Sequence, residues 1–235
     1  MTKFYDTVDP ESYEKRYLKN LREYYMHKHW KKKIILILHM ICKNKIVLDL
    51  GSGTSTYSKI ISKVSSECIG IDISIKMLSY AKKRIHKDAI HLVLGDAEVL
   101  PFRPESFDAL VSIGLFEYVD RTKVVLQIKE ILKHDGLLII SCPNKYGACR
   151  FPLRLLYSIM KRPRAQCEPS LKEILGLFNK NGFTIMTYQM DDYLFPFPYF
   201  LEHLISFKFY EFFEKHNPLR VNLFSNVMLL IFKKN

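Results

Sequence analysis

Apolar side chains follow two different spacings along this chain. Through residues 11–42 they recur every three or four positions, which predicts a helical N-terminal segment. From Lys45 onward, short apolar runs alternate with amphipathic stretches. Such an alternation of strands and helices predicts an α/β fold with right-handed crossovers and a mostly parallel sheet.

Five apolar runs in the centre of the chain predict five strands, most of them followed by helical spacing. We expect strands at Ile46–Leu50, Cys68–Ile73, Ile90–Leu94, Phe107–Ile113 and Leu137–Cys142. We expect helices at Thr54–Val64, Thr122–Leu132 and Ser74–Ile85, the last with Ser74 as its N-cap.

The pattern changes after Pro143. Residues 143–169 are basic and irregular, which favours a lid or an insertion. A helix is predicted over Leu171–Asn181, because Gly182 is typical of the residue that ends a helix. Two final strands are expected at Phe183–Met190 and Asn226–Lys233.

Residues 191–222 contain ten aromatic side chains, an unusual density. Two interpretations remain open. The segment is either a helical insertion packed on the sheet, or an apolar acceptor pocket or lipid-contacting surface. Basic residues such as Lys161, Arg162 and Arg164 would flank the second kind of surface.

Composition indicates one globular domain spanning residues 1–235, with 48% hydrophobic and 26% charged residues. The five cysteines lack the spacing of a zinc site or a disulfide scaffold, so we expect reduced thiols in a cytoplasm and no bound metal. The N-terminal residues lack the apolar core of a secretory signal. The apolar run Ile34–Cys42 is too short to span a bilayer.

The net charge of +12 lies outside the central segment. Residues 46–142 contain 12 basic and 12 acidic residues, whereas residues 1–45 contain 11 and 5 and residues 143–235 contain 13 and 7. A neutral centre with basic flanks indicates either partner-facing surfaces, a membrane surface among them, or charge that serves solubility alone.

The first candidate ligand-binding segment follows the strand at Ile46–Leu50. Gly51 and Gly53 come directly after that strand, where open α/β sheets bind ligands. The third glycine of the dinucleotide fingerprint is absent, since Thr56 occupies its place. Asp49 would repel a pyrophosphate but suits the ammonium group of an amino-acid cofactor.

Acidic residues also follow the second and third strands. Asp72 lies 23 residues beyond Asp49, close to the spacing of the acid that binds ribose hydroxyls in dinucleotide folds. It could equally serve as an acid at a helix N-terminus. Asp96 could accept from an adenine amino group while the Ala97 N–H faces the ring. Asp108, at the start of its strand, is expected to be structural.

Together the motifs VLDLGSGTS, GIDIS, GDAEVLPF, ESFDALVS and LKHDGLLIIS resemble class I S-adenosylmethionine-dependent methyltransferases. They are most similar to the small-molecule type that includes quinone-ring C-methyltransferases. The resemblance covers residues 46–142, the cofactor-binding core, with residues 1–45 as a helical cover. It implies a Rossmann-like seven-stranded sheet with an antiparallel last strand, S-adenosylmethionine as cofactor and S-adenosylhomocysteine as product.

The resemblance also assigns site residues. Asp49, Gly51 and Gly53 would line the methionine part of the cofactor, Asp72 the ribose, and Asp96 and Ala97 the adenine. The other expected cofactor contacts are Ser52, Ile73, Glu98 and Ser112, with Tyr13 and Arg16 similar to covering residues of some relatives. Met77 is expected either to pack on the adenosine or to be a core methionine. Ser55 departs from the family pattern, in which a third glycine is common.

Methyl transfer from a sulfonium requires mainly alignment and at most one base. Glu117, just after the fourth strand, is the candidate base, and a surface or cofactor-adjacent carboxylate is the equal alternative. Tyr118 and His134 are weaker candidates. We expect a small, hydrophobic or aromatic acceptor and a cytoplasmic protein, with peripheral membrane contact as an option.

Two other functions stay open. The basic flanks would suit a nucleic-acid methyltransferase, although the amide–proline motif for an exocyclic amine is missing after the fourth strand, where Ser112-Ile113-Gly114-Leu115 stands. A non-catalytic cofactor-binding partner subunit is the other alternative.

Overall fold

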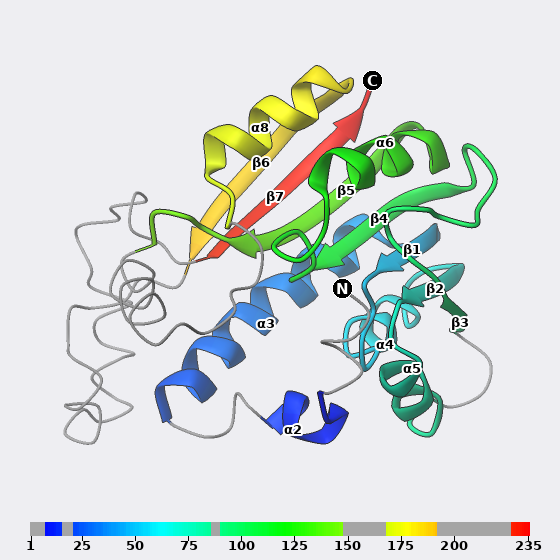
Figure 1. Cartoon of the computed structure of the whole chain (residues 1–235), viewed down its shortest axis with the longest axis vertical. Coiled ribbons are helices and arrows are strands. Elements are labelled where there is room, and N and C mark those ends of the chain that lie inside the picture. Colours follow the sequence, from blue (N-terminus) through cyan, green and yellow to red (C-terminus); the bar gives the residue numbers. More distant parts are fainter. Residues whose placement is uncertain (1–7, 16–20, 86–89, 148–167, 192–226) are drawn as a thin grey trace.

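The computed structural model describes residues 8–15, 21–85, 90–147, 168–191 and 227–235. Its centre is one seven-stranded sheet with the order β3-β2-β1-β4-β5-β7-β6 (Figure 1). The strands are β1 (Ile46–Leu50), β2 (Glu67–Asp72), β3 (His91–Leu94), β4 (Phe107–Ile113), β5 (Leu132–Pro143), β6 (Phe183–Asp191) and β7 (Val227–Lys234). β1 to β5 pair in parallel, and β7 runs antiparallel to β5 and β6. The expected Rossmann-like fold with an antiparallel last strand is confirmed.

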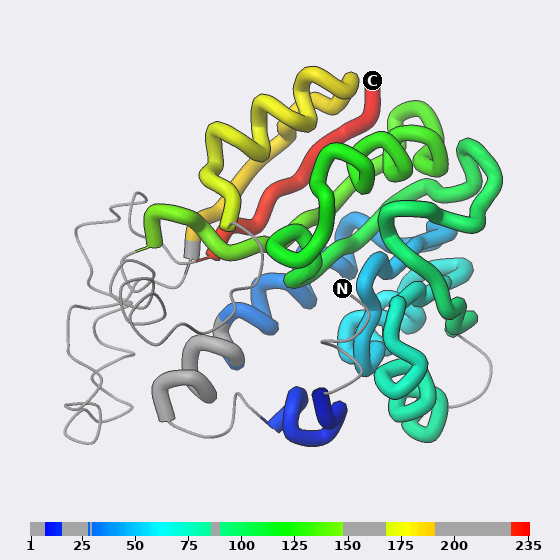
Figure 2. The backbone as a smooth tube through the Cα atoms, viewed as in Figure 1, coloured from blue at the N-terminus to red at the C-terminus, as the bar shows by residue number. Residues whose placement is uncertain are grey.

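Helices cover both faces of the sheet. The described helices are α2 (Pro10–Lys15), α3 (Leu21–Ile41), α4 (Ser58–Ile61), α5 (Ile75–Lys82), α6 (Arg121–Ile131) and α8 (Leu171–Lys180). α3 and α4 pack on one face, and α6 and α8 pack on the other, as the backbone traces show (Figures 1 and 2).

The alternation of side chains along β7 builds two cores. Met228, Leu230 and Phe232 face α6 and α8, whereas Leu229 and Ile231 face α3. Phe232 stacks on a phenylalanine of α8, Phe178, with 4.4 Å between ring centroids. Each such fully buried side chain stabilises the fold by about 1.5–3 kcal/mol.

One helix start and one helix end agree with the sequence expectation. Ser74 accepts from the Met77 N–H and caps α5. Gly182, in the left-handed region at φ +87°, follows the end of α8 as expected. The N-terminal helix expected over residues 11–42 is instead two helices, α2 and α3, with residues 16–20 between them outside the described range.

Two boundaries differ from the sequence expectation for physical reasons. The helix after β1 begins at Ser58 rather than Thr54, because Ser55 has a φ of +59° that no right-handed helix accepts. β5 begins at Leu132 rather than Leu137, because an irregularity in its pairing with β4 accommodates the polar residues in between. Asp135 in this stretch has a φ of +62°.

Several expectations fall outside the described residues. They concern Arg16, most of the expected lid at 143–169, and the aromatic segment 191–222 apart from Asp191. Within the described part of the chain, no helix combines the length and the hydropathy that a membrane span requires.

Candidate functional site

The loop after β1 forms a tight bend against β2. Gly51 and Gly53 have φ values of +75° and +52°, in the left-handed region that favours glycine. The N–H groups of Gly51 and Ser52 both donate to the Ile71 carbonyl at 2.9 Å. A methyl group added at Gly53 would meet no atom within 4 Å, so open space lies beside this turn.

Asp72, at the end of β2, is fixed by the same bend. Its Oδ2 accepts from the Gly53 N–H at 2.8 Å, and its Oδ1 accepts from the Ser74 N–H at 2.9 Å. Burial raises its pKa, against the effect of these backbone hydrogen bonds. A carboxylate held in this way retains lone pairs that can accept further hydroxyl donors.

Asp49, at the end of β1, is buried below the bend with 2% of its surface exposed. The Ser58 hydroxyl donates to its Oδ2 at 2.5 Å. Burial raises the pKa of Asp49 to about 7, and the nearby charge of Asp72 adds to this effect. The acid is therefore poised to ionise when a positive charge approaches it.

These residues fit the cofactor that the sequence motifs imply. Neither Asp49 nor Asp72 forms an ion pair with any lysine or arginine of the described residues. The hydroxyls of Ser52 and Ser55 are buried and have no hydrogen-bond partner in that part of the chain. A ligand with a cationic group and hydroxyls suits these side chains, whereas a pyrophosphate would meet two acids that no lysine or arginine of the described residues pairs with.

The segment after β3 lies against the same sheet edge but turns onto itself. The Gly95 N–H donates to the Asp72 carbonyl at 3.0 Å, which joins the two strand ends. Asp96 is exposed, and its Oδ1 accepts from the Glu98 N–H at 2.9 Å. Ala97, between them, is half-buried. Glu98 accepts from the Asp120 N–H at 2.9 Å and so holds the start of α6.

Other expected contacts surround the bend from below. Ile73 follows Asp72 directly and is half-buried, and Met77 is 2% exposed in the first turn of α5. The Ser112 hydroxyl donates to the Leu50 carbonyl at 3.1 Å and so joins β4 to β1 beneath the bend.

Glu117 lies at the carboxyl ends of β4 and β5. It is 8% exposed, and its Oε1 would lie 3.8 Å from a methyl group added at Gly114. Its charge also contributes, after burial, to the raised pKa of the buried Cys142 thiol. The Leu115 side chain would contact a methyl group added at Gly51 at 3.2 Å, so this loop closes on the bend.

The remaining residues singled out in the sequence lie at two opposite ends of the sheet. Tyr118 is half-buried beside Glu117. His134 is exposed at the opposite, amino end of the sheet, where its Nδ1 lies 3.1 Å from Asp135. Asp108 is also at that end, where it accepts from the Ile46 N–H and from Lys133 at 2.8 and 2.7 Å. The structural role expected of Asp108 agrees with these contacts.

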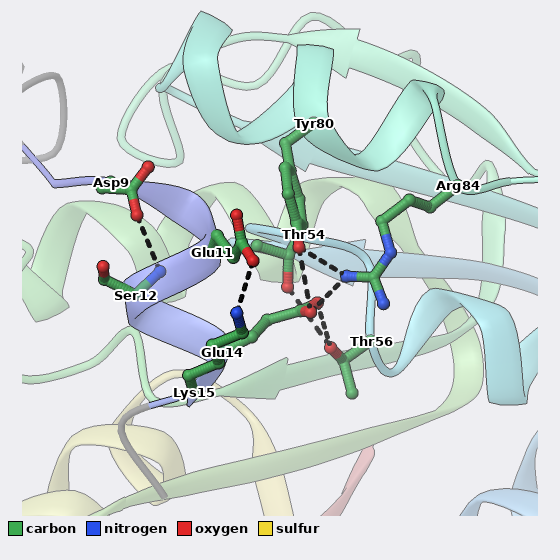
Figure 3. Close-up of polar contacts among 9 residues, drawn as sticks. All are labelled: Asp9, Glu11, Ser12, Glu14, Lys15, Thr54, Thr56, Tyr80 and Arg84. Atoms are coloured by element: carbon green, nitrogen blue, oxygen red, sulfur yellow. Dashed lines mark hydrogen bonds and ion pairs between the residues drawn. The ribbon is translucent and has the colours of Figure 1, made fainter. Parts of the chain in front are cut away.

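Helix α2 packs beside the bend through Glu14 (Figure 3). Glu14 accepts from the Thr56 hydroxyl and the Tyr80 hydroxyl, each at 3.4 Å, and forms an ion pair with Arg84. Arg84 also donates to the Tyr80 hydroxyl at 2.9 Å. Tyr13, the expected covering residue, is half-buried next to Glu14.

Sequence reasoning missed Glu14, Ser58 and Leu115. Ser58 has no local signal, because the sequence predicts a helix from Thr54 that would place Ser58 in its second turn. Glu14 partners Arg84 across 70 residues, and Leu115 approaches Gly51 across the sheet, so neither contact has a local sequence signal.

The sequence comparisons with known proteins match methyltransferases. Residues 48–140 match a family model described as a methyltransferase domain. A demethylmenaquinone methyltransferase of Staphylococcus saprophyticus is 31% identical over 192 residues, covering 71% of this chain and 82% of that protein. One from Thermotoga maritima is 34% identical over 52% of this chain and 54% of its own length. The chain spans about half the length of several curated relatives it matches.

Solved structures share the fold at lower identity. Magnesium protoporphyrin IX methyltransferase from Synechocystis, with bound SAH, superposes with a TM-score of 0.71 at 14% identity, covering 100% of this chain and 98% of that one. An S-adenosylmethionine-dependent methyltransferase from Mesorhizobium loti gives 0.63 at 16% identity, over 86% and 96% of the two chains. The structural similarity extends beyond residues 46–142, which contain the sequence motifs.

Proposed function

This chain belongs to the class I S-adenosylmethionine-dependent methyltransferases, and from that premise we propose that it transfers a methyl group to a small, apolar or aromatic acceptor. The observation that carries the proposal is a pair of acids at the strand ends, the buried Asp49 and the half-buried Asp72, that no lysine or arginine of the described residues neutralises. A cationic donor would complete this charge arrangement.

Different residues of the site would bind different groups of S-adenosylmethionine. Asp72, held by the Gly53 and Ser74 N–H groups, would accept the two ribose hydroxyls. Asp49 would attract the ammonium group, and the open space beside Gly53 would leave room for the ligand at the bend.

The remaining contacts would enclose the nucleoside. Asp96 and Ala97 would hold the adenine edge. The other proposed contacts are Ser52, Ile73, Met77, Glu98, Ser112, Tyr13 and Arg16. Of these, Glu98 and Ser112 have structural hydrogen bonds of their own, so we expect their substitution to act partly through the loops they hold.

When bound, S-adenosylmethionine supplies a methyl group that is already activated by its sulfonium. The protein's task is then to align the acceptor and exclude water. Glu117, buried at the carboxyl ends of β4 and β5, is proposed as the base that takes a proton from the acceptor. Leu115 would keep water from the bend on the same side.

The proposal also specifies the chemistry of the acceptor, which we expect to be apolar. Relatives named demethylmenaquinone methyltransferases support an acceptor with an aromatic or quinone-like ring. The ten aromatic residues of 191–222 support an apolar pocket or a lipid-contacting surface, and the basic flanks support contact with a membrane surface.

Calorimetry with S-adenosylhomocysteine tests the cofactor part. We expect binding by the wild type and a loss of about 100-fold in affinity for Asp72→Ala, since a fixed acceptor of two hydroxyls is removed. Asp108→Ala at the opposite end of the sheet is the matched control and should bind normally. Unchanged affinity in Asp72→Ala would refute the placement of the ribose.

A methyl-transfer assay tests the acceptor. Radiolabelled donor is supplied with ring acceptors of increasing hydrophobicity and with small polar amines as the comparison set. Higher kcat/KM toward the apolar rings supports the proposal, and activity confined to polar acceptors contradicts it. A fall in kcat for Glu117→Gln without a change in cofactor affinity would support its role as base.

A further inference from the structure

Helix α3 has two opposite faces of different chemistry. Ile34 and Leu38 are fully buried against the sheet. Leu36 and Met40, one helical turn apart from each other, are 59% and 82% exposed. At about 100° per residue, Leu36 lies opposite the line between Ile34 and Leu38, so its side chain points away from the protein.

Exposed lysines stand before and after the two apolar residues along the chain. Lys28 and Lys32 precede Leu36 at helical spacing, and Lys43 lies just beyond the end of α3 at Ile41; all three are exposed. We call these five residues the outer stripe of α3: Lys28, Lys32, Leu36, Met40 and Lys43. An aliphatic pair is therefore exposed on the outer side of the helix, with lysines before it and one lysine just beyond the end of the helix.

The stretch of sequence that contains the outer stripe has no acidic residue. Between Glu23 and Asp49 there are six lysines and no acidic residue. This contrasts with residues 46–142, where basic and acidic residues balance. The local field therefore favours a partner with negative charge.

We propose that the outer stripe of α3 docks on the surface of an anionic lipid bilayer. Leu36 and Met40 would enter the boundary between headgroups and acyl chains, and the lysines would extend their ammonium groups to the anionic headgroups. A nucleic acid would satisfy the lysines but leave both aliphatic side chains against phosphates. A second copy of the same stripe would bring like charges together.

Docking of the outer stripe would be the membrane contact named in the proposed function. Its biological purpose, access to an apolar acceptor, rests on that proposed function. The residues that would bind the bilayer are separate from those that would bind the cofactor. The stripe shares no residue with the cofactor site, so vesicle binding and methyl transfer can fail independently.

Co-sedimentation with vesicles tests the inference on the full chain. Vesicles of phosphatidylcholine mixed with phosphatidylserine are compared with phosphatidylcholine alone. We expect Leu36→Asp with Met40→Asp, and separately Lys32→Glu with Lys43→Glu, each to weaken binding to the anionic vesicles about tenfold or more. Raised salt should weaken the wild type in the same direction.

The matched control lies on the opposite face of the sheet. Leu126, 50% exposed on α6, and the exposed Lys129 give the pair Leu126→Asp with Lys129→Glu, which should bind vesicles as the wild type does. All variants are titrated with S-adenosylhomocysteine, and unchanged affinity shows that they remain folded.

Four outcomes overturn the inference. They are no binding of the wild type to anionic vesicles, equal loss in the α6 pair, full binding by both stripe pairs, or a dimer that the Leu36 and Met40 changes dissociate. Binding of an RNA oligonucleotide that only the lysine pair weakens, with vesicle binding absent, would replace the lipid by a nucleic acid. Vesicle binding without methyl transfer to any apolar ring would refute the proposed acceptor and leave the docking surface standing.

Discussion

The two ends of the sheet treat acidic side chains in opposite ways. At the amino end, Asp108 contacts Lys133 and Asp135 contacts Lys233, each at 2.7 Å. Lys233 lowers the pKa of Asp135. At Asp108 burial raises the pKa, but the hydrogen bonds from Lys133 and the Ile46 N–H outweigh it and the net shift is downward.

At the carboxyl end, Asp49 and Asp72 lack such partners in the described structure, and burial raises the pKa of both. The ionised form of aspartate is thus stabilised by lysines at the amino end, and it is disfavoured at the carboxyl end, where ligands bind. Unneutralised burial of an acid costs stability, so its presence indicates a function for that charge. Substitutions at the two ends should separate these roles.

The largest expected effect is at Asp49. Asp49→Asn keeps the shape and an acceptor for Ser58 but removes the charge. We expect the affinity for S-adenosylhomocysteine to fall about 100-fold, while the free energy of unfolding at pH 8 rises by about 1–3 kcal/mol. Calorimetry and denaturant unfolding measure the two quantities, and a variant that is less stable than the wild type would break the comparison.

This stability gain should depend on pH. The folded pKa of Asp49, about 7, is raised above its ordinary value of 3.8, so the wild type loses stability as the pH rises between these values. The advantage of Asp49→Asn should therefore be smaller at pH 5 than at pH 8. An equal gain at both values would show that the substitution acts by packing instead.

Cofactor affinity should follow the same ionisation with the opposite consequence. The ammonium group of S-adenosylhomocysteine favours the ionised form of Asp49, so wild-type affinity for this ligand should weaken up to about tenfold between pH 8 and pH 6. Proton release on binding, seen as a buffer-dependent heat, is the second signature. Asp49→Asn should show neither, and a pH dependence that survives in this variant would assign the titration elsewhere.

At the amino end the effect is on stability alone. Asp108→Ala removes the contact with Lys133 and the acceptor for the Ile46 N–H. We expect the free energy of unfolding to fall by about 1 kcal/mol, with cofactor affinity unchanged. Weakened cofactor binding at this site would show that the two ends are coupled.

The smallest effect is expected at the contact between α2 and the bend. The Glu14–Arg84 pair is partly exposed, at 23% and 44%, so it should contribute little. We expect Glu14→Gln to weaken S-adenosylhomocysteine binding about two- to fivefold through the faster dissociation that stopped-flow measures. Exchange of the two charges, Glu14→Arg with Arg84→Glu, should restore part of the loss, and additive losses would contradict pairing.

The features of the fold that depend on local pattern could be predicted from sequence. The strand ends at Asp49 and Asp72, the glycine bend and the Ser74 cap all follow from spacing over a few residues. They were recognised because turn chemistry and hydrophobic alternation act locally.

The features that were missed depend on tertiary contact. The left-handed Ser55 delays α4, which in turn brings Ser58 to Asp49. Glu14 reaches Arg84 only because α2 packs against α5. Nothing local to either position encodes these distances. The aromatic segment 191–222 lies almost wholly outside the described residues, so the expectation about the acceptor stays a prediction.

The position of β7 sets the order in which the sheet can be completed. β7 is last in sequence but lies between β5 and β6, with seven paired positions on one side and eight on the other. During synthesis on the ribosome, β6 emerges well before the strand that joins it to the rest of the sheet. The cofactor half, β1 to β4, can pair while translation continues, whereas β6 waits for the final residues of this segment.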